Sequence, residues 1–323
     1  MNSVCRWSRP STRRLLGAAR LAFSAVIASA LLLVAGCTRG GSQAAASAQK
    51  LFVTVPESRQ LVIYESGAAG AAAPLQVITE DAPDKPVDVA VDFIGEAFVA
   101  NENGNVRVYA PHEDQKYKIF KNYAGSNTRI QHPTAIAVNK AGSFFVADAG
   151  DGQGRLEWFS GGANGNLVPE RVIAGAETGI HDPRGVAFDG SGRFFVSDRT
   201  SNRVVIFDAN AEGDATPIAH LEGLHSPGHL AVDDLLNVYV VNEADNSIAV
   251  FASNGPESWA LSATITSKSL TRPTGVTTDA AGEIAAGAIG GVLFFASNAE
   301  RNADPVRMLT GSNSFNPAGI CIH

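Results

Sequence analysis

The sequence has 323 residues, of which 45% are hydrophobic and 18% are charged, and its formal net charge is −7. This acidic balance argues against nucleic acid and anionic lipid headgroups as partners, because both attract basic surfaces. A chain of this length can form two domains or one large domain, so the patterns along the sequence have to decide between them.

Residues 1–36 are predicted to be a lipoprotein signal peptide. They contain five arginines and no acidic residue, and they end in an apolar run, Leu21 to Gly36, that is too short to be typical of a membrane-spanning helix. Val34-Ala35-Gly36-Cys37 resembles a bacterial lipobox, in which the cysteine becomes the lipidated first residue. The alternatives are an ordinary signal peptide or an N-terminal anchor with an incidental Cys37, and residues 12–16 also resemble part of a twin-arginine signal.

Removing this segment takes the net charge from −7 to −12, because only arginines leave. Residues 37–49, rich in Gly, Ala, Ser and Gln, are predicted to be a flexible tether. With Cys5 removed and Cys37 lipidated, Cys321 has no partner for a disulfide, and we expect a small buried side chain there rather than a reactive thiol. The protein is thus predicted to be an exported monomer, attached to a bacterial membrane through its lipid anchor only and facing the periplasm or the cell exterior.

A seven-residue phrase repeats along residues 50–323: a proline, three residues of which the third is apolar, a small residue, a second apolar residue, and a closing Asp or Asn. The six copies, the last of them truncated, begin at Pro86, Pro133, Pro183, Pro227, Pro273 and Pro317. Their spacing of 44 to 50 residues is typical of propeller blades, and a full copy begins a series of four β-rich runs. We therefore predict an all-β, six-bladed β-propeller of four-stranded antiparallel blades over residues 50–323.

The two ends of the chain predict how this ring closes. Residues 51–54, 61–64 and 76–78 match the second, third and fourth runs of a blade, so the first blade lacks its first strand. The truncated copy at 317–322 can supply that strand, and closing the ring removes an unpaired sheet edge. The C-terminal strand is therefore predicted to join the N-terminal blade.

Residues 183–208 closely resemble an NHL repeat, and the other copies resemble it with lower fidelity over roughly residues 51–322. The resemblance implies an NHL-type propeller. Such propellers include protein- and RNA-binding modules, extracytoplasmic sensors and a few enzymes, so the resemblance indicates the fold better than the activity.

The strongest candidate site lies in the loops that precede each first strand. These loops should converge on one mouth of the central channel, and four of the seven histidines lie in them. Such a polar rim can bind an anionic or metal ligand, although polar loop tips are expected in any propeller. The predicted ligand-binding residues are His132, His181, Asp182, Arg184, His225, His229 and Arg272, and no catalytic residue is assigned.

A second recurring polar position directly follows each second run. It holds Asn101, Asp148, Asp198 and Asn242 in four of the blades. Oxygen side chains in a ring could suit calcium, but Asp and Asn also begin turns by hydrogen bonding to their own backbone. We favour the turn role.

Two enzyme families with similar propellers can be compared residue by residue. In the peptide-amidating lyase propeller, zinc-binding histidines directly follow such prolines, whereas here those positions hold Val87, Thr134, Arg184, Gly228, Thr274 and Ala318. His229 comes one residue later, where strand alternation is expected to turn its side chain to the other side. The gluconolactonase-like family binds its metal through a Glu in a Glu-Gly-Pro context, which is absent from this sequence. No cofactor is predicted, and a divalent metal stays an alternative.

The favoured interpretation is a binding or scaffold module for an envelope protein, peptide or glycan, rather than an enzyme. The alternative is a metal-dependent propeller hydrolase or lyase, lactonase-like, with its site at the channel mouth.

Overall fold

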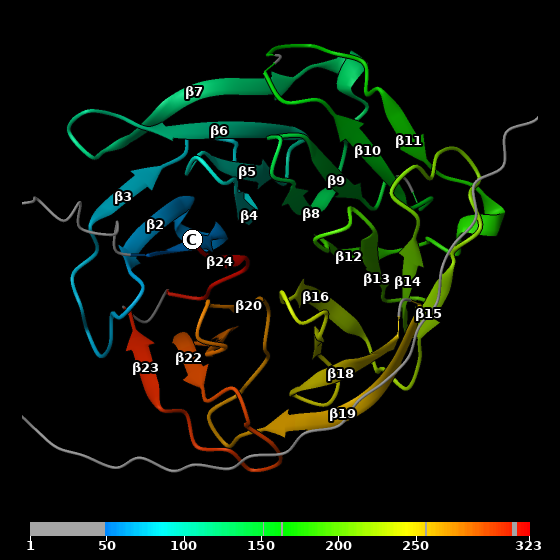
Figure 1. The fold of residues 1–323 in the computed structure, drawn as a ribbon. Coiled ribbons are helices and arrows are strands. Elements are labelled where there is room, and N and C mark those ends of the chain that lie inside the picture. The colour runs from blue at the N-terminus through cyan, green and yellow to red at the C-terminus, as the bar shows by residue number, and fades with distance from the viewer. Residues whose placement is uncertain (1–48, 151, 163, 256, 312–314) are drawn as a thin grey trace, which may run out of the picture. The chain divides into compact units, whose positions relative to one another are not determined.

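The described residues form six antiparallel sheets of four strands each, which surround a central axis as the blades of a propeller (Figure 1). The structure is a computed structural model, and it describes residues 49–150, 152–162, 164–255, 257–311 and 315–323. The predicted signal peptide, Cys37 and most of the tether lie outside the described residues. The ring confirms the predicted fold class and blade count.

The blades are numbered here in chain order, and their strands are as follows. Blade 1 contains β24 (Ile320–Ile322), β1 (Lys50–Val55), β2 (Gln60–Glu65) and β3 (Gln76–Thr79). Blade 2 contains β4 (Pro86–Val91), β5 (Ala97–Asn101), β6 (Asn105–Pro111) and β7 (Tyr117–Ala124). Blade 3 contains β8 (Pro133–Val138), β9 (Phe144–Asp148), β10 (Arg155–Phe159) and β11 (Arg171–Ile173). Blade 4 contains β12 (Pro183–Phe188), β13 (Phe194–Asp198), β14 (Arg203–Phe207) and β15 (Ala219–Leu221). Blade 5 contains β16 (Pro227–Val232), β17 (Val238–Asn242), β18 (Ser247–Gly255) and β19 (Ser258–Thr266). Blade 6 contains β20 (Val276–Thr278), β21 (Ile284–Ala288), β22 (Gly291–Phe295) and β23 (Arg307–Thr310).

Helical structure is limited to single turns in the described part of the chain. These are the 3-10 helices Pro56–Ser58, Ser126–Thr128 and Ala176–Thr178. A helix with the length and apolar character needed to span a bilayer does not occur among the described residues.

The strand that begins each blade is the innermost one. Around the axis, β4, β8, β12, β16, β20 and β24 each contact the next, and β24 contacts β4 again (Figure 1). The repeated phrase therefore builds the wall of the central channel. Small residues at the centre of the phrase suit this position because six strands converge there.

The ring closes through the C-terminus, as the sequence predicts. In blade 1, β24 pairs antiparallel with β1, with Cys321 opposite Phe52 and Ile320 opposite Val53. Thr54 and Gly319 extend this pairing, because the backbone N–H of Thr54 donates to the carbonyl oxygen of Gly319 at 3.0 Å and the N–H of Gly319 donates to Thr54 Oγ1 at 2.7 Å. The two ends of the propeller are thus one sheet.

The closing Asp or Asn of the phrase shapes the hairpin between the first and second strands. In blade 4, Oδ1 of Asp189 accepts hydrogen bonds from the N–H groups of Ser191 at 2.9 Å and Arg193 at 3.0 Å. Gly192 lies between them with φ of +87°, a conformation that glycine adopts without strain. The same pair of hydrogen bonds, two and four residues on, recurs at Asp92, Asn139, Asp233 and Asp279.

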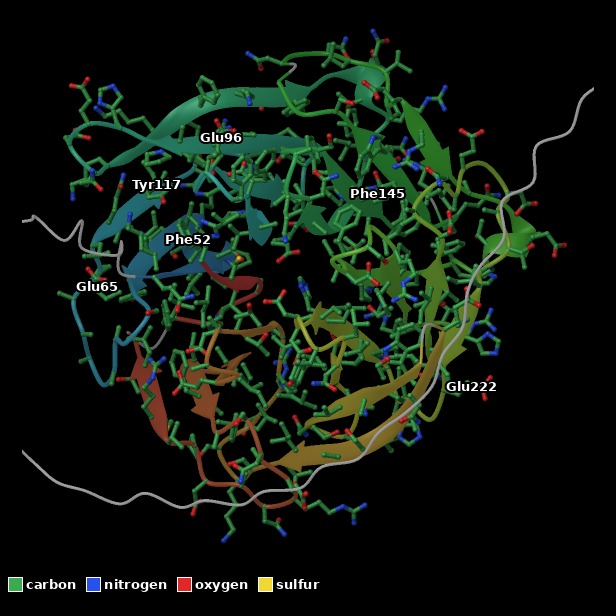
Figure 2. All side chains as sticks on the ribbon, in the orientation of Figure 1. Phe52, Glu65, Glu96, Tyr117, Phe145 and Glu222 are labelled. Carbon is green, nitrogen blue, oxygen red and sulfur yellow. The ribbon has the colours of Figure 1, made fainter. Side chains whose placement is uncertain are left out.

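Aromatic side chains pack the space between neighbouring blades. Phe145 of blade 3 lies with its ring centroid 4.7 Å from that of Phe194 in blade 4, and Phe52 of blade 1 makes an edge contact of 5.3 Å with Tyr117 of blade 2. Figure 2 shows Phe52 and Phe145 inside the ring, whereas Glu222 points outward. Burying such rings contributes on the order of 2 kcal/mol each, so the blades depend on their neighbours.

Cys321 lies on an inner strand and packs against the core between blades 1 and 2, but it is half-buried rather than fully buried as the sequence predicts. Burial raises the pKa of its thiol to about 12. The thiol is therefore protonated at neutral pH and is a poor nucleophile.

A carboxyl group is buried in the middle of blade 3. Glu157 on β10 is fully buried; Oε1 accepts a hydrogen bond from Nε of Arg155, and Oε2 has no hydrogen-bond partner among the described residues. Burial, together with the negative charge of Asp148, raises the pKa of Glu157 to about 8 despite the opposing effect of Arg155. Folding therefore favours the protonated carboxyl.

This raised pKa predicts how stability depends on pH. In the unfolded chain the pKa of this carboxyl is near its ordinary value of 4.5, so the folded state is favoured below that pH and loses stability as the pH rises towards about 8. Glu157→Gln, which is isosteric and uncharged, is expected to reduce this loss, which is on the order of a few kcal/mol in the wild type. Urea unfolding at pH 5 and at pH 8 measures it, and equal pH slopes in the two proteins would contradict the prediction.

Candidate functional site

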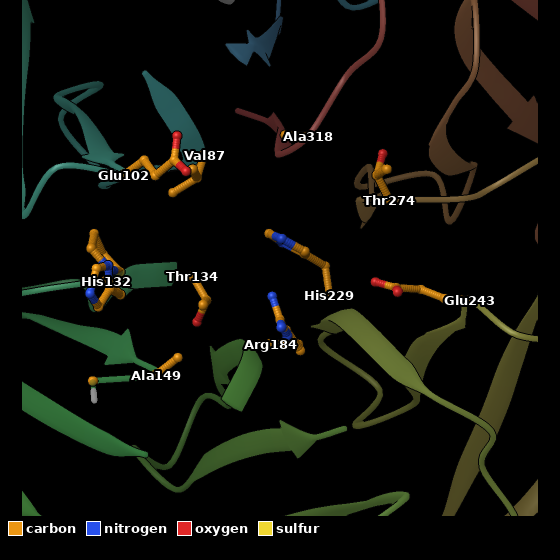
Figure 3. Close-up of a pocket in the computed structure, with 12 residues that line it drawn as sticks. Val87, Glu102, His132, Thr134, Ala149, Arg184, His229, Glu243, Thr274 and Ala318 are labelled. Carbon is orange, nitrogen blue, oxygen red and sulfur yellow. The ribbon is translucent and has the colours of Figure 1, made fainter. Parts of the chain in front are cut away.

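A cavity of about 450 Å³ opens on the axis at the face that carries the loops before the first strands. Figure 3 shows that side chains from several blades point into it. The lining residues are Val87, Glu102, His132, Pro133, Thr134, Ala149, Gly150, Arg184, His229, Glu243, Thr274 and Ala318. Every blade contributes, so the site exists only in the closed ring.

The loops at this mouth are held by the polar residues that end the second strands. Oδ2 of Asp198 accepts hydrogen bonds from the backbone N–H groups of His181 at 2.6 Å and Asp182 at 2.7 Å, while Oδ1 accepts from Ser201 in its own turn at 2.8 Å. Asp148 binds the loop of blade 3 in the same way, and Asn242 binds that of blade 5. Oδ1 of Asp148 also accepts a hydrogen bond from the N–H of Gly150 at 2.6 Å, so the favoured turn role is confirmed for Asp148 and Asp198, whose oxygens in addition fix the loops that present the rim residues.

Three of the seven predicted ligand-binding residues line the cavity. They are His132 of blade 3, Arg184 of blade 4 and His229 of blade 5. Figure 3 shows Arg184 and His229 side by side near the centre of the cavity, with His132 on one side and Glu243 on the other. Ligand binding by these three residues stays a prediction, but their convergence is a feature of the structure.

The other four predicted residues lie outside the lining of the cavity. His181 is exposed, and the exposed His225 places Nδ1 2.6 Å from Oδ2 of Asp245. Arg272 is also exposed, and its backbone N–H donates to the side chain of Asn246 at 2.6 Å. These three side chains are therefore exposed to solvent and do not line the cavity.

Asp182 acts on the cavity through Arg184. Its Oδ1 lies 3.0 Å from Nε of Arg184, and its Oδ2 accepts a hydrogen bond from Nε of Arg199 at 2.8 Å. The carboxylate is thus shared by two arginines, and it limits the directions in which the guanidinium of Arg184 can point.

The expectation that strand alternation turns His229 away from the mouth is wrong. Pro227 pairs with Asn242, whereas Leu230 pairs with Val240, so three steps along β16 face two steps along β17. This β-bulge resets the alternation and brings the imidazole into the cavity. The first strands of blades 2, 3 and 4 carry a similar irregularity after their prolines.

Beneath the cavity, His229 meets a carboxylate from the opposite side of the ring. Its Nδ1 lies 3.5 Å from Oδ1 of Asp88 on β4. Asp88 is buried, and its Oδ2 accepts a hydrogen bond from the backbone N–H of Ile136 at 2.9 Å. Burial raises the pKa of Asp88, and the charge of His229 and backbone hydrogen bonds oppose that rise.

Two acidic side chains of the cavity were missed by sequence reasoning. Glu102 lies 3.4 Å from Nζ of Lys85, and Glu243 lies so close over Gly228 that a Cβ there would come within 2.8 Å of Oε1. The signal was available, because each glutamate directly follows the recurring Asn that ends the second strand.

The residues present do not fit a divalent metal site. Within the described part of the chain, no group of three or more His, Cys, Asp or Glu side chains converges as metal ligands would. In the cavity, His229 already faces Asp88 and Glu102 already faces Lys85. What the arrangement offers instead is an imidazole that can transfer protons beside a guanidinium that can stabilise an anion.

Solved structures support the fold. A protein of unknown function from Bacteroides caccae matches with a TM-score of 0.64 and 13% identity, covering 85% of this chain and 99% of that one. The periplasmic gluconolactonase PpgL from Pseudomonas aeruginosa matches with a TM-score of 0.57 and 13% identity, over 85% of this chain and 98% of that one. A putative 6-phosphogluconolactonase from Bacteroides uniformis matches with a TM-score of 0.54 and 16% identity, over 80% and 81%.

The sequence itself matches one family model, while a search among curated proteins finds no match. The model is described as Lactonase, 7-bladed beta-propeller, and it matches residues 60–312. The described residues form six blades where that description names seven, and the NHL resemblance stays a prediction. Because the match spans well over half of the sequence, the chain belongs to the Lactonase, 7-bladed beta-propeller family.

Proposed function

We propose that the chain is an exported hydrolase that opens a lactone in the cavity at the channel mouth. The observation that carries this proposal is that His229 and Arg184 meet in one cavity on the axis of a lactonase-family propeller. The family match gives the hydrolase alternative more support than the binding or scaffold module that the sequence alone favoured.

The two side chains match what lactone hydrolysis requires. Water has to be deprotonated as its oxygen bonds to the carbonyl carbon, and the carbonyl oxygen has to be stabilised as it becomes an anion. His229 would accept the proton from water, and Arg184 would stabilise the oxyanion. The ring C–O bond then breaks, the leaving oxygen takes the proton from His229, and a hydroxy acid is released.

A sugar-acid lactone is the proposed substrate class. Two structural neighbours are named as a periplasmic gluconolactonase and a putative 6-phosphogluconolactonase, and a cavity that contains both Arg184 and two glutamates suits a polyhydroxylated substrate that yields a carboxylate. The periplasmic neighbour also supports export, for which lipidation at Cys37 stays the proposed means of attachment. Metal analysis of the purified chain tests the divalent-metal alternative.

Turnover by the purified full chain tests the proposal. We expect the wild type to hydrolyse glucono-δ-lactone faster than the spontaneous reaction, as followed by proton release in a pH-stat. Arg184→Gln is expected to lower kcat/KM by about 100-fold, because it removes the charge that stabilises the oxyanion. Arg272→Gln is the matched control, since Arg272 is exposed outside the cavity, and it should leave turnover unchanged.

Two results would contradict the proposal. One is a folded protein that does not catalyse hydrolysis of either unphosphorylated or phosphorylated sugar-acid lactones. That result would favour the alternative role, a binding module for a protein, peptide or glycan. The other is an equal loss of turnover in the Arg184 and Arg272 variants.

A further inference from the structure

We infer that Asp88 is a positioning residue for His229, and that these two side chains, from opposite blades, form one acid–base pair across the ring axis. The inference deepens the proposed lactone hydrolysis and rests on it. It assigns a role to a buried carboxylate that neither the family match nor the cavity lining identifies.

The two residues occupy equivalent positions in opposite blades. Each comes two residues after the proline of the repeated phrase, Asp88 after Pro86 and His229 after Pro227. Between their strands β4 and β16 lie β8 and β12 on one side of the ring and β20 and β24 on the other (Figure 1). Contact between Nδ1 of His229 and Oδ1 of Asp88 at 3.5 Å therefore spans the channel.

The other blades leave room for this pair. At the same position they hold Ala135, Gly185, Gly275 and Gly319. A Cβ on Gly319 would lie 2.2 Å from Oδ1 of Asp88, and a Cβ on Gly185 would lie 2.9 Å from Cα of His229. Small residues are thus required beside the pair at Gly319 and Gly185.

Asp88 is held so that one oxygen is directed to the imidazole. The backbone N–H of Ile136 in blade 3 donates to Oδ2 at 2.9 Å, which leaves Oδ1 to face Nδ1 of His229. A buried carboxylate at this place favours a proton on Nδ1, and Nε2 is then the nitrogen that can accept a proton from water. Orientation and tautomer of the proposed base are therefore set from the far side of the ring.

The pair also separates the channel into two cavities. His229 lines the cavity of about 450 Å³ at the mouth, and Asp88 and His229 together line a second cavity of about 240 Å³ further along the axis. The imidazole stands at the boundary, so a substrate that enters from the mouth meets His229 at the end of its path.

Asp88→Asn tests the inference kinetically. The change keeps the size of the side chain and removes its charge, and we expect kcat to fall about 10- to 100-fold with KM within about twofold, a smaller loss than removal of the base itself, because Asp88 acts only through His229. Asp245→Asn is the matched control, because it removes the carboxylate partner of the exposed His225 outside the cavity. In the double variant Asp88→Asn/His229→Gln, the loss should equal that of His229→Gln alone, whereas additive losses would overturn the inference.

The tautomer of His229 provides a readout that needs no turnover. In the wild type at a pH where the imidazole is neutral, nitrogen NMR shifts are expected to show the proton on Nδ1, and Asp88→Asn should shift the population towards Nε2–H. A wild type with Nε2–H would overturn the pair even if lactones are hydrolysed. An Nδ1–H tautomer without turnover would instead retain the pair and remove the proposed function, and the wild-type spectrum decides this even where the variant fails to fold.

Discussion

Deletion of residues 316–323 is expected to abolish cooperative thermal unfolding and to leave a chain that aggregates. The deleted segment contains β24, which pairs with β1, and Ile320, which is buried against Leu51 and Val53. It also accepts a hydrogen bond at Pro317 from Oγ1 of Thr274 in blade 6 at 2.6 Å. Loss of this burial, these hydrogen bonds and the closed edge is comparable with the roughly 5–15 kcal/mol that stabilises a folded protein of this kind.

A milder change at the same junction separates ring closure from loss of chain length. Gly319→Ala places a Cβ 2.6 Å from Cα of Asp88, a backbone atom that cannot move aside easily, and should destabilise the fold by about 2–3 kcal/mol. Gly190→Ala is the control, because a Cβ there meets no atom within 4 Å. Circular dichroism melting of the three variants is the measurement. A truncated chain that melts like the wild type would show that closure does not hold the ring together.

What repeats along this chain could be predicted from the sequence. The repeated proline phrase predicted the blade count and the ring closure, because each copy forms the innermost strand of one blade. Asp189 and its equivalents close a hairpin with the same two hydrogen bonds in blades 2 to 6, whose first two strands are consecutive in the chain, and Asp148 and Asp198 hold the mouth loops in the same way. Such local geometry depends on residues near in sequence, which is why reading the repeats succeeds.

The site was predicted less well because it depends on departures from the repeat. Simple strand alternation predicts that the His229 side chain points away from the channel mouth. Only the register of β16 against β17 shows the bulge that brings this side chain into the cavity. The contact with Asp88 joins residues 141 positions apart, and no spacing rule within a blade points to it. His181 and His225 resemble His132 in the sequence, but they do not line the cavity.

His229→Gln is expected to lower kcat by about 1000-fold, which lies within the usual range for loss of a general base. Glutamine has a similar size and can still form hydrogen bonds at the end of β16, but its amide does not take up a proton at neutral pH. KM should change little, because the proposed role of His229 is in the chemical step rather than in substrate binding. Steady-state hydrolysis of glucono-δ-lactone, corrected for the spontaneous rate, measures both constants.

The control for this change is His225→Gln, which makes the same substitution in a histidine that also faces an aspartate. Nδ1 of His225 lies 2.6 Å from Asp245, but the side chain is 64% exposed and outside the cavity, so its replacement should leave kcat and KM unchanged. Full activity in a folded His229→Gln protein would show that His229 is not the general base and would leave His132 and Glu243, which line the same cavity, as candidates. Equal losses in both variants would argue against the cavity as the catalytic site, because only one of the two histidines lies in it.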